Sequence, residues 1–296
     1  QTCALPISPM RNFAGKTALI TGAGGGIGRA LALAAAARGM HVVACDIHSA
    51  PLDALHVDAR AAGAASVIGR TLDVRDAEAF VALASECDHA LGGIDLLFCN
   101  AGVIVPRRLW EQTAREFDWL LDVNVKGVVN AVRACVPSML ARGTPAHVVI
   151  TGSMGGFIPS PLLGAYSASK AALHSLAETL CLDLAASGAK IGVSLLAPGA
   201  VRSNLFDLDR HRAAGAAPLE GAAAAVREAM VAGTARVGMD PSQVAELAFA
   251  AIEAERFWVF PHPEMLAALP ERQTAMLDGH TPSFDFERSF RPPAAR

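Results

Sequence analysis

Short, continuous apolar runs alternate along the chain with longer segments whose apolar residues recur at helical spacing. The runs, rich in Val, Ile and Leu, cover residues 17–21, 41–46, 66–69, 96–100, 147–151 and 191–196, with a last candidate at 257–260. The helical patterns cover residues 28–38, 53–62, 76–91, 111–141, 165–187, 241–254 and 264–277. Strands that are apolar on both faces are typical of a sheet covered by helices on both sides. The pattern therefore predicts an α/β fold, a doubly wound parallel sheet of about seven strands.

Glycines and aspartates mark several of the expected helix ends. Four glycines follow helical patterns, where a residue in the left-handed conformation often ends a helix, namely Gly39, Gly63, Gly143 and Gly188. Asp53 and Asp76 stand at the starts of two patterns, where a carboxylate can accept hydrogen bonds from free backbone N–H groups.

The regular alternation stops near Pro198. Residues 201–238 are rich in Ala, Gly and Arg and carry no strand pattern, so we expect a substrate lid there, with a plain surface insertion as the alternative. Residues 278–296 read as a polar tail, and residues 1–9 as a non-native or disordered leader. A single domain over residues 10–277 remains.

The composition narrows the class of protein. Of the 296 residues, 52% are hydrophobic and 18% are charged, and the formal net charge is −3, which excludes an intrinsically disordered chain. No basic block points to nucleic acid, and no apolar stretch reaches the roughly 18 residues of a membrane span. The six cysteines form no CxxC pair, which favours buried thiols, no metal site and a cytoplasmic protein.

A glycine-rich turn joins the first strand to the first helix. Residues 21–28 read Thr-Gly-Ala-Gly-Gly-Gly-Ile-Gly, and Gly22, Gly26 and Gly28 let the backbone turn tightly. The start of the helix offers free N–H groups and the positive end of its dipole to a phosphate. Such a turn alone is a weak signal, but its place between a strand and a helix favours a dinucleotide site.

Asp46 stands at the end of the second strand. A carboxylate there can accept hydrogen bonds from the adenosine ribose hydroxyls, and it repels a 2′-phosphate. Neither Gly25 nor Ile47 supplies a cation for that phosphate. We therefore expect NAD rather than NADP as the cofactor, with a strand-end turn former as the alternative role of Asp46.

Tyr166, the only tyrosine of the chain, and Lys170 stand four residues apart at the start of a helical pattern, so they share one helix face. A phenol has an ordinary pKa of about 10, which must fall if it is to act as a base near neutral pH. A neighbouring ammonium group and an oxidised nicotinamide ring can lower that pKa. A chance helical pair is the alternative, and for these two residues alone it is favoured.

Two further polar residues strengthen the functional interpretation. Ser153 follows the fifth strand, and parallel topology brings that strand end to the same rim of the sheet as the helix start with Tyr166. A hydroxyl there can hydrogen-bond a substrate oxygen. Asn124 lies inside a helical pattern, where a poor helix former predicts a kink or a bound water, with a tolerated polar residue as the alternative.

Over about residues 14–260, these motifs together resemble the short-chain dehydrogenase/reductase family, in its standard-length branch. The matching residues are Thr21, Gly22, Gly26, Gly28, Asp73, Asn100, Ala101, Gly102, Asn124, Ser153, Tyr166, Lys170, Pro198 and Gly199. Two positions depart from the family's pattern, since Cys99 stands where an asparagine is usual and Ser203 where a threonine is common. The resemblance implies a Rossmann-type domain.

The resemblance also implies a role for each matching residue. Tyr166 would exchange the proton of the substrate hydroxyl, while Lys170 would lower the phenol pKa and hold the nicotinamide ribose. Ser153 would orient the substrate oxygen, and Asn124 would keep a water that relays protons from Lys170. The cofactor site would be lined by Gly22, Gly26, Ile27, Gly28, Asp46, Asp73, Val74, Asn100, Ala101, Gly102, Tyr166, Lys170, Pro198, Gly199, Val201 and Ser203.

These roles predict reversible hydride transfer between a secondary alcohol and a ketone. The residues expected around the substrate are, besides Ser153, the apolar Met154, Phe157, Leu163, Leu205 and Phe206. They favour a hydrophobic or aromatic substrate, with ordinary packing under the lid as the alternative. Three stretches, at 155–157, 202–205 and 257–263, also resemble the aryl ether Cα-dehydrogenase group, which would mean oxidation of a benzylic alcohol of lignin-derived aryl ethers.

Two other functions stay open on the same scaffold. One is a non-catalytic protein that senses nicotinamide nucleotides, although a sensor has no need of all four expected catalytic residues. The other is an epimerase or dehydratase of the family's extended branch, against which the spacing of the glycine turn argues. The family also implies a homotetramer or homodimer that pairs the helices at 111–141 and 165–187. The leucines of the second helix can equally face its own sheet.

Overall fold

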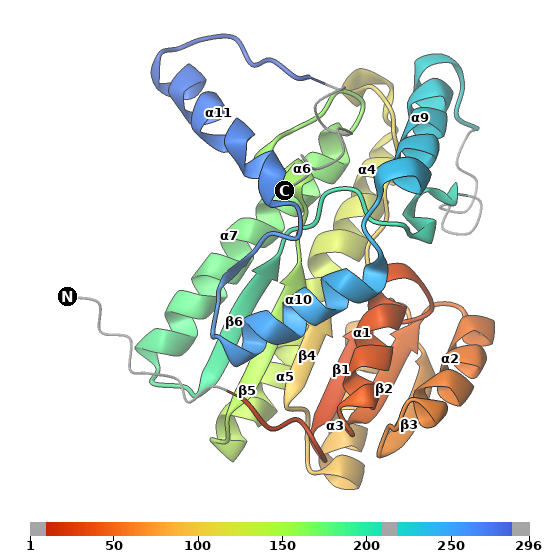
Figure 1. Cartoon of the computed structure of the whole chain (residues 1–296), viewed down its shortest axis with the longest axis vertical. Coiled ribbons are helices and arrows are strands. Elements are labelled where there is room, and N and C mark those ends of the chain that lie inside the picture. The colour runs from red at the N-terminus through yellow and green to blue at the C-terminus, as the bar shows by residue number, and fades with distance from the viewer. Residues whose placement is uncertain (1–9, 209–217, 286–296) are drawn as a thin grey trace.

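Seven parallel strands form one sheet in the order β3-β2-β1-β4-β5-β6-β7, in a computed structural model that describes residues 10–208 and 218–285 (Figure 1). The strands are β1 Thr17–Thr21, β2 His41–Asp46, β3 Ser66–Thr71, β4 Leu96–Cys99, β5 Ala146–Thr151, β6 Ile191–Leu196 and β7 Trp258–Val259. The strand order reverses between β1 and β4, and ligands of such sheets bind at the carboxyl ends of the strands near this point. The predicted doubly wound sheet is confirmed.

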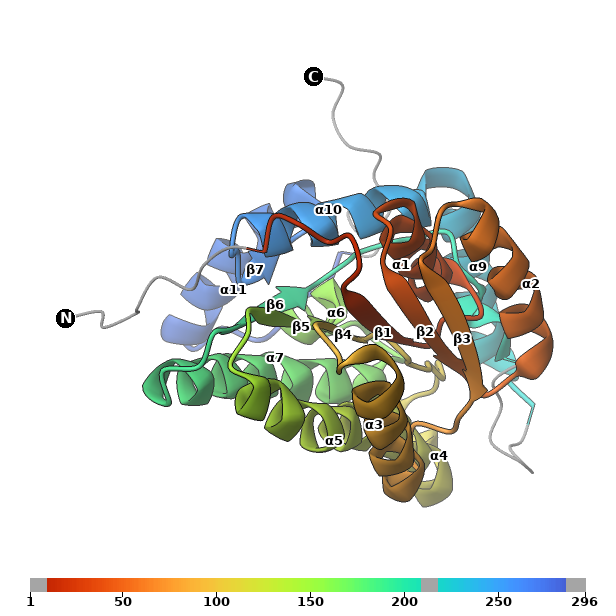
Figure 2. The ribbon, with the colours of Figure 1, turned by 90° about the horizontal axis from the view of Figure 1, so that it is seen from below.

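Helices cover both faces of this sheet, as Figure 2 shows. One layer consists of α1 Gly26–Ala37, α2 Ser49–Ala61 and α10 Pro241–Glu253, and the other of α3 Ala77–Leu91, α5 Gly127–Arg142 and α7 Gly164–Ala186. Each layer has its own apolar core. Leu31 and Phe249 are buried in the first, and Phe80 and Leu173 in the second. Burial on both sides explains why the strands are continuously apolar.

The single helix expected over residues 111–141 is divided. A 3₁₀ turn, η1 (Leu109–Glu111), is followed by α4 (Ala114–Leu121), a π-helical turn η2 (Asp122–Lys126), and then α5. Thr113 begins α4 because its hydroxyl accepts a hydrogen bond from the Glu116 N–H, while the Glu116 carboxylate accepts one from the Thr113 N–H. Asn124 lies in the π-helical turn, so the regular α-helix is interrupted at the residue that fits it poorly.

The other expected helix ends are confirmed with one exception. The four glycines expected to end helices all have positive φ, namely Gly39, Gly63, Gly143 and Gly188. Asp76 caps α3, since its carboxylate accepts hydrogen bonds from the N–H groups of Glu78 and Ala79. Asp53 does not cap a helix, because α2 already begins at Ser49.

The described part of the segment 201–238 contains helical structure. It holds a 3₁₀ turn, η3 (Asn204–Phe206), and the alanine-rich helix α9 (Gly221–Val237). Residues 209–217, the leader 1–9 and residues 286–296 of the tail lie outside the described residues. Another 3₁₀ turn, η4 (Pro263–Ala267), leads into α11 (Ala268–Leu277), which lies at the same end of the molecule as α9 (Figure 1).

The leucines that recur along α7 divide between two environments. Leu173 and Leu184 are buried against the sheet, whereas Leu176 is 38% exposed.

The five cysteines within the described residues are unpaired, and burial raises the pKa of the thiols of Cys45, Cys87, Cys99 and Cys135. In the part of the chain that the structure describes, no helix combines the length and apolar character needed to cross a membrane.

Candidate active site

A cavity of about 950 Å³ lies at the carboxyl ends of the strands, where the glycine-rich turn faces the segments that follow β4, β5 and β6. With the exception of Gly28, every residue expected at the cofactor site lines it. Ser153, Met154, Leu163, Leu205 and Phe206, expected near the substrate, also line it. The structure thus brings together residues that are spread along the chain from Gly22 to Phe206.

The glycine-rich turn lies against the segment after β4. Gly22 has a φ of +65°, and a Cβ there would lie 2.9 Å from the Cα of Ala101. Gly28 does not line the cavity, because it packs where a Cβ would collide with the carbonyl oxygen of Gly22. Gly25 precedes α1 without a side-chain cap, so the first N–H groups of the helix are left for another acceptor. This arrangement fits a pyrophosphate.

Asp46 is fixed at the end of β2 by two backbone groups. Its Oδ2 accepts a hydrogen bond from the Gly24 N–H at 2.9 Å, and its Oδ1 accepts one from the His48 N–H at 3.0 Å. The carboxylate lines the cavity on the side of the glycine-rich turn. Asp73, after β3, lines the same cavity and is paired with Arg75, whose hydrogen bond lowers the pKa of the Asp73 carboxyl.

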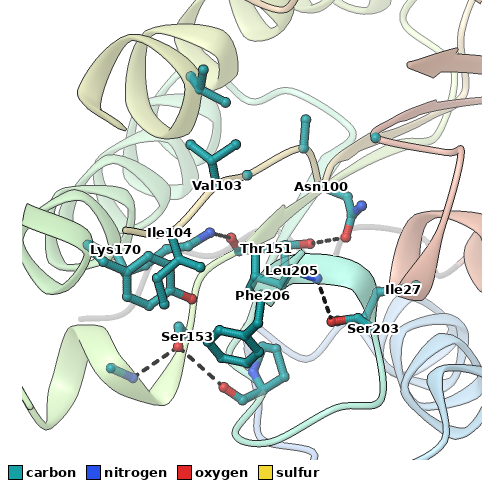
Figure 3. Close-up of a pocket in the computed structure, with 18 of the residues that line it drawn as sticks. Ile27, Asn100, Val103, Ile104, Thr151, Ser153, Lys170, Ser203, Leu205 and Phe206 are labelled. Atoms are coloured by element: carbon teal, nitrogen blue, oxygen red, sulfur yellow. Dashed lines mark hydrogen bonds between the residues drawn. The ribbon is translucent and has the colours of Figure 1, made fainter. Parts of the chain in front are cut away.

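A hydrogen-bond network around Asn100 joins three strand ends. The Asn100 Nδ2 donates to the Thr21 carbonyl at 3.1 Å, and the Thr21 hydroxyl accepts from the Asn100 N–H at 2.9 Å. The Thr151 hydroxyl donates to the Asn100 Oδ1 at 3.3 Å (Figure 3). These bonds hold β1, β4 and β5 in register at the floor of the cavity. Sequence reasoning did not assign this role to Thr151.

Asn124 is fully buried and does not itself line the cavity. Its Oδ1 accepts a hydrogen bond from the Val103 N–H at 2.8 Å, and its Nδ2 donates to the Val103 carbonyl at 3.0 Å and to the Ser169 hydroxyl at 2.9 Å. A Cβ on Gly102 would lie 3.4 Å from both the Asn124 Oδ1 and the Lys170 Nζ. Asn124 therefore fixes the backbone beside Lys170.

Tyr166 and Ser153 meet in the cavity. The Ser153 hydroxyl accepts from the Gly155 N–H at 3.0 Å and donates to the Pro198 carbonyl at 3.5 Å (Figure 3). A Cβ on Gly155 would lie 3.4 Å from both the Ser153 Oγ and the Tyr166 Cε1, so the two side chains are neighbours. Burial raises the pKa of the Tyr166 phenol, and the neighbouring Ser153 hydroxyl acts in the opposite direction. The protein by itself therefore raises this pKa, contrary to the expectation, because the lost hydration of the phenolate outweighs the effect of Ser153.

Lys170 is buried, and its Nζ donates to the Thr151 carbonyl at 2.8 Å (Figure 3). Its Nζ lies 5.8 Å from the centre of the Tyr166 ring, on the same face of α7. Burial lowers the pKa of the Lys170 ammonium to about 8. The amine is thus held beside the phenol by the end of β5, a partner that helical spacing does not reveal.

The part of the cavity where we expect the substrate is largely apolar, and one residue expected there does not line it. Phe157 does not line the cavity, because its ring stacks on His174 with the centres 4.0 Å apart. Apolar residues that the sequence pattern did not single out also line it, among them Ile104, Met230, Met265 and Phe284. They come from a loop, α9, η4 and the tail, which only the tertiary fold brings together.

Comparisons with known proteins agree with this geometry. The family described as short chain dehydrogenase matches residues 16–213. A Cα-dehydrogenase of a Sphingobium species is 31% identical over 278 residues, 92% of this chain and 89% of the relative. A 1-deoxy-11-β-hydroxypentalenate dehydrogenase of Streptomyces exfoliatus is 34% identical over 254 residues, 84% of each chain.

A crystal structure of a short-chain dehydrogenase/reductase from Burkholderia phymatum, in complex with NAD, has the same fold. Its TM-score is 0.90 at 37% identity, over 94% of this chain and 99% of that one. The glycine-rich turn, the uncapped start of α1 and Asp46 fit the same class of dinucleotide. The chain therefore belongs to the short-chain dehydrogenase/reductase family, as an oxidoreductase with a site for a nicotinamide cofactor.

Proposed function

We propose that the protein is an NAD-dependent dehydrogenase that interconverts a secondary alcohol and a ketone, with Tyr166 as its general acid and base. One observation carries the proposal. The side chains of Tyr166 and Ser153 are neighbours in the cavity that the glycine-rich turn also lines. A proton donor and a dinucleotide site in one cavity are what alcohol–ketone interconversion requires.

The proton transfer falls to Tyr166 and Ser153. The bound nicotinamide ring supplies or accepts the hydride. During reduction, the neutral phenol of Tyr166 donates its proton to the carbonyl oxygen, while the Ser153 hydroxyl hydrogen-bonds that oxygen. During oxidation, the same proton returns from the alcohol to Tyr166. The apolar side chains on one side of the cavity limit the water near this exchange.

Lys170 and Asn124 support the proton transfer in this proposal. The Lys170 amine, held by the Thr151 carbonyl, lies where it can bind the nicotinamide ribose and pass a proton toward Tyr166. Asn124 fixes Val103 and Ser169 beside it, in a π-helical turn. Such turns recur at functional sites. In this proposal the turn holds a water molecule that links Lys170 to solvent.

The choice of NAD over NADP rests on Asp46. Both carboxylate oxygens accept backbone hydrogen bonds and remain at the cavity wall, so the negative charge is fixed where an adenosine ribose would lie. A 2′-phosphate there would meet like charge. Arg29, the basic residue at the start of α1, is paired with Asp58 instead.

The substrate is proposed to be hydrophobic or aromatic. Apolar side chains on the substrate side support this, namely Ile104, Met154, Leu163, Leu205, Phe206 and Met265. Helix α9 adds Met230 and Thr234, which supports a lid role for the segment 201–238. The similarity to a Cα-dehydrogenase favours a benzylic alcohol as the first substrate to examine.

The test is turnover of a panel of secondary alcohols, benzylic, alicyclic and aliphatic, with NAD and separately with NADP. Reduction of the cofactor is followed by its absorbance. We expect turnover with NAD and the highest kcat/KM with a benzylic or other apolar alcohol. Tight dinucleotide binding without turnover of any alcohol or ketone would instead favour a nucleotide sensor.

A further inference from the structure

The main chain that follows β6 forms a wall of the cavity beside Ser153. Pro198, Gly199 and Ala200 line the cavity and are called the 198–200 wall below. The Pro198 carbonyl accepts a hydrogen bond from the Met154 N–H at 2.9 Å and one from the Ser153 hydroxyl at 3.5 Å. The 198–200 wall is therefore joined to the segment that is proposed to take part in proton transfer.

The nicotinamide half of a bound dinucleotide is expected against this wall. In the proposed function, Asp46 binds the adenosine ribose and the glycine-rich turn binds the pyrophosphate, so the other half of the cofactor extends toward Ser153. The wall is main chain there, because Gly199 has no side chain. The contacts that fix this main chain therefore decide where the nicotinamide half can bind.

His262 contacts the 198–200 wall without lining the cavity itself, and it is only 7% exposed. Strand β7 pairs in parallel with β6, and Val259 is the partner of Leu196 (Figure 2). Three residues further along each chain, the Gly199 N–H donates to the His262 Nδ1 at 3.0 Å. The His262 Nε2 lies 2.9 Å from the Ala200 carbonyl oxygen. One imidazole thus bonds to two consecutive residues of the wall.

The two partners determine which ring nitrogen of His262 carries the proton. A backbone N–H can only donate, so Nδ1 is an unprotonated acceptor, and a carbonyl can only accept, so Nε2 carries the proton and donates it. Burial lowers the pKa of His262, which favours this neutral ring. The imidazole therefore offers the wall one acceptor and one donor, as the backbone of a neighbouring strand does.

Prolines on both sides of His262 explain why a side chain makes these bonds. Pro261 and Pro263 have no N–H, so the chain beyond β7 has no backbone donor at these two positions. Each proline also restricts its own backbone and that of the residue before it, and Pro263 begins η4. His262 is thereby presented to the wall in a restricted backbone conformation, and its ring extends the pairing of β6 and β7 beyond the end of β7.

The wall is packed closely between His262 and the end of the lid segment. A Cβ on Gly199 would lie 3.1 Å from the His262 Cγ and 2.6 Å from the Met265 Sδ, so both side chains lie directly on the main chain. The Ala200 carbonyl also accepts a hydrogen bond at 2.9 Å from the N–H of Met239, which follows α9. The position of the wall therefore depends on His262 as well as on the lid segment.

We propose that His262 is a positioning residue that fixes the main chain of Gly199 and Ala200 as the wall against which the nicotinamide half of the cofactor binds. It acts through its two hydrogen bonds to that main chain. Without them the wall can move, which weakens the binding of the nicotinamide half and leaves the contacts of the adenosine half in place. The inference rests on the proposed function for the place of the nicotinamide half, but it concerns binding and needs no turnover.

The test compares NADH with ADP-ribose, which lacks only the nicotinamide ring, by calorimetric titration. The variants are His262→Leu, which loses both bonds, and His262→Asn, which has nearly the same shape as the leucine and keeps an acceptor near the place of Nδ1. His147→Leu is the matched control, since it removes another buried histidine bond, to Ser194, near the amino end of β5. Hydrogen exchange of the Gly199 amide in the free protein is a second measurement that needs no ligand.

The wild type should bind NADH more tightly than ADP-ribose. We expect His262→Leu to weaken the binding of NADH by about 10-fold and that of ADP-ribose little, the size of effect that the loss of one hydrogen bond produces. His262→Asn should weaken NADH binding by only about 3-fold, because one of the two bonds can still form. His147→Leu should leave the ratio of the two dissociation constants unchanged. The Gly199 amide should exchange fastest in His262→Leu and at an intermediate rate in His262→Asn.

Several results would overturn the proposal. They are equal affinities of the wild type for the two ligands, equal weakening of both ligands in His262→Leu, as large a loss of NADH binding in His262→Asn as in His262→Leu, the same change of ratio in His147→Leu, or unchanged exchange of the Gly199 amide in His262→Leu.

Two further outcomes are distinguishable from these. If His262→Leu does not fold, His262→Asn decides the matter by itself, since a weaker binding of NADH relative to ADP-ribose supports the proposal and an unchanged ratio contradicts it. If no alcohol or ketone is turned over, the proposed function fails. The binding and exchange measurements then still decide the role of His262, because neither needs a substrate.

Discussion

The carboxylate of Asp46 accepts a hydrogen bond from the backbone N–H of Gly24, with 2.9 Å between Oδ2 and the nitrogen. The end of β2 is thereby joined to the turn between β1 and α1. A Cβ on Gly24 would lie 2.7 Å from the same oxygen, so a larger residue would push the carboxylate away. The group that we propose to bind the ribose is therefore fixed by the turn that we propose to bind the pyrophosphate.

Asp46→Asn should weaken the preference for NAD over NADP by roughly 10- to 100-fold, because hydrogen bonds to charged groups contribute about 1.5–3 kcal/mol and the repulsion of a 2′-phosphate is lost. The ratio of kcat/KM for the two cofactors measures this. Asp53→Asn is the control, because it removes an exposed carboxylate that lies on α2 and not at the end of β2. An unchanged ratio in Asp46→Asn would mean that Asp46 does not contact the ribose.

Tyr166→Phe should lower kcat by roughly 10²- to 10⁴-fold, the usual contribution of general acid–base catalysis. The dissociation constant of NAD should change little, because the phenyl ring still fills the buried site. Steady-state kinetics and a fluorescence titration with NAD measure the two quantities. Retention of a large share of kcat would show that another group transfers the proton.

Lys170 should make the folded state more stable as the pH rises. Its pKa is lowered to about 8 from an ordinary value of 10.5, so the folded state binds fewer protons than the unfolded state between these pH values. The cost of burying the ammonium is complete below about pH 8 and disappears toward pH 10.5, which amounts to about 3 kcal/mol in the free energy of unfolding. The buried cysteine thiols and the Tyr166 phenol, whose pKa values are raised, act in the opposite direction, so the contribution of Lys170 is measured by denaturant titration as a difference from a variant without it.

Lys170→Met is the matched variant for that measurement, since it keeps the length of the side chain and removes the titrating group. The wild type minus Lys170→Met difference in the free energy of unfolding should grow in favour of the wild type from pH 8 to pH 10.5. Parallel pH profiles for the two proteins would mean that Lys170 is not held with a lowered pKa.

Gly28→Ala should destabilise the fold, whereas Gly25→Ala should not. The added Cβ at Gly28 would collide with the Gly22 carbonyl oxygen, while at Gly25 the nearest atom is the Asn204 Nδ2, at 3.7 Å. We expect Gly28→Ala to cost about 3 kcal/mol of unfolding free energy, the upper range for overpacking. Gly25→Ala should instead weaken NAD binding. Equal stability of the two variants would contradict the packing described for Gly28.

Asn124→Ala should lower the free energy of unfolding by about 3 kcal/mol, because it leaves buried groups of Val103 and Ser169 without their partner. Asn130→Ala is the control, since Asn130 donates a single bond, to the Val74 carbonyl, and is less buried. Its loss should be clearly smaller. If the two variants lost similar amounts of unfolding free energy, the Asn124 network would contribute no more to stability than the single, partly buried bond of Asn130.

Features that depend on local periodicity were predictable from the sequence. The first six strands, the glycines that end helices and the turn at Gly22 follow from short-range sterics and from which faces are apolar. Tyr166 and Lys170 share a helix face because four residues make about one turn. The interruption of the α-helix at Asn124 follows from the poor fit of this residue to a helix, although the π-helical form does not.

Tertiary packing decided the features for which local pattern gives no signal. Phe157 is apolar and close to Ser153 in sequence, but only the fold shows that its ring stacks on His174 rather than lining the cavity. The pKa of Tyr166 rises because of burial, which is set by distant segments and not by the neighbouring Lys170. Hydrophobic periodicity determines which face of an element is buried, whereas the partner on that face depends on contacts between residues far apart in the chain.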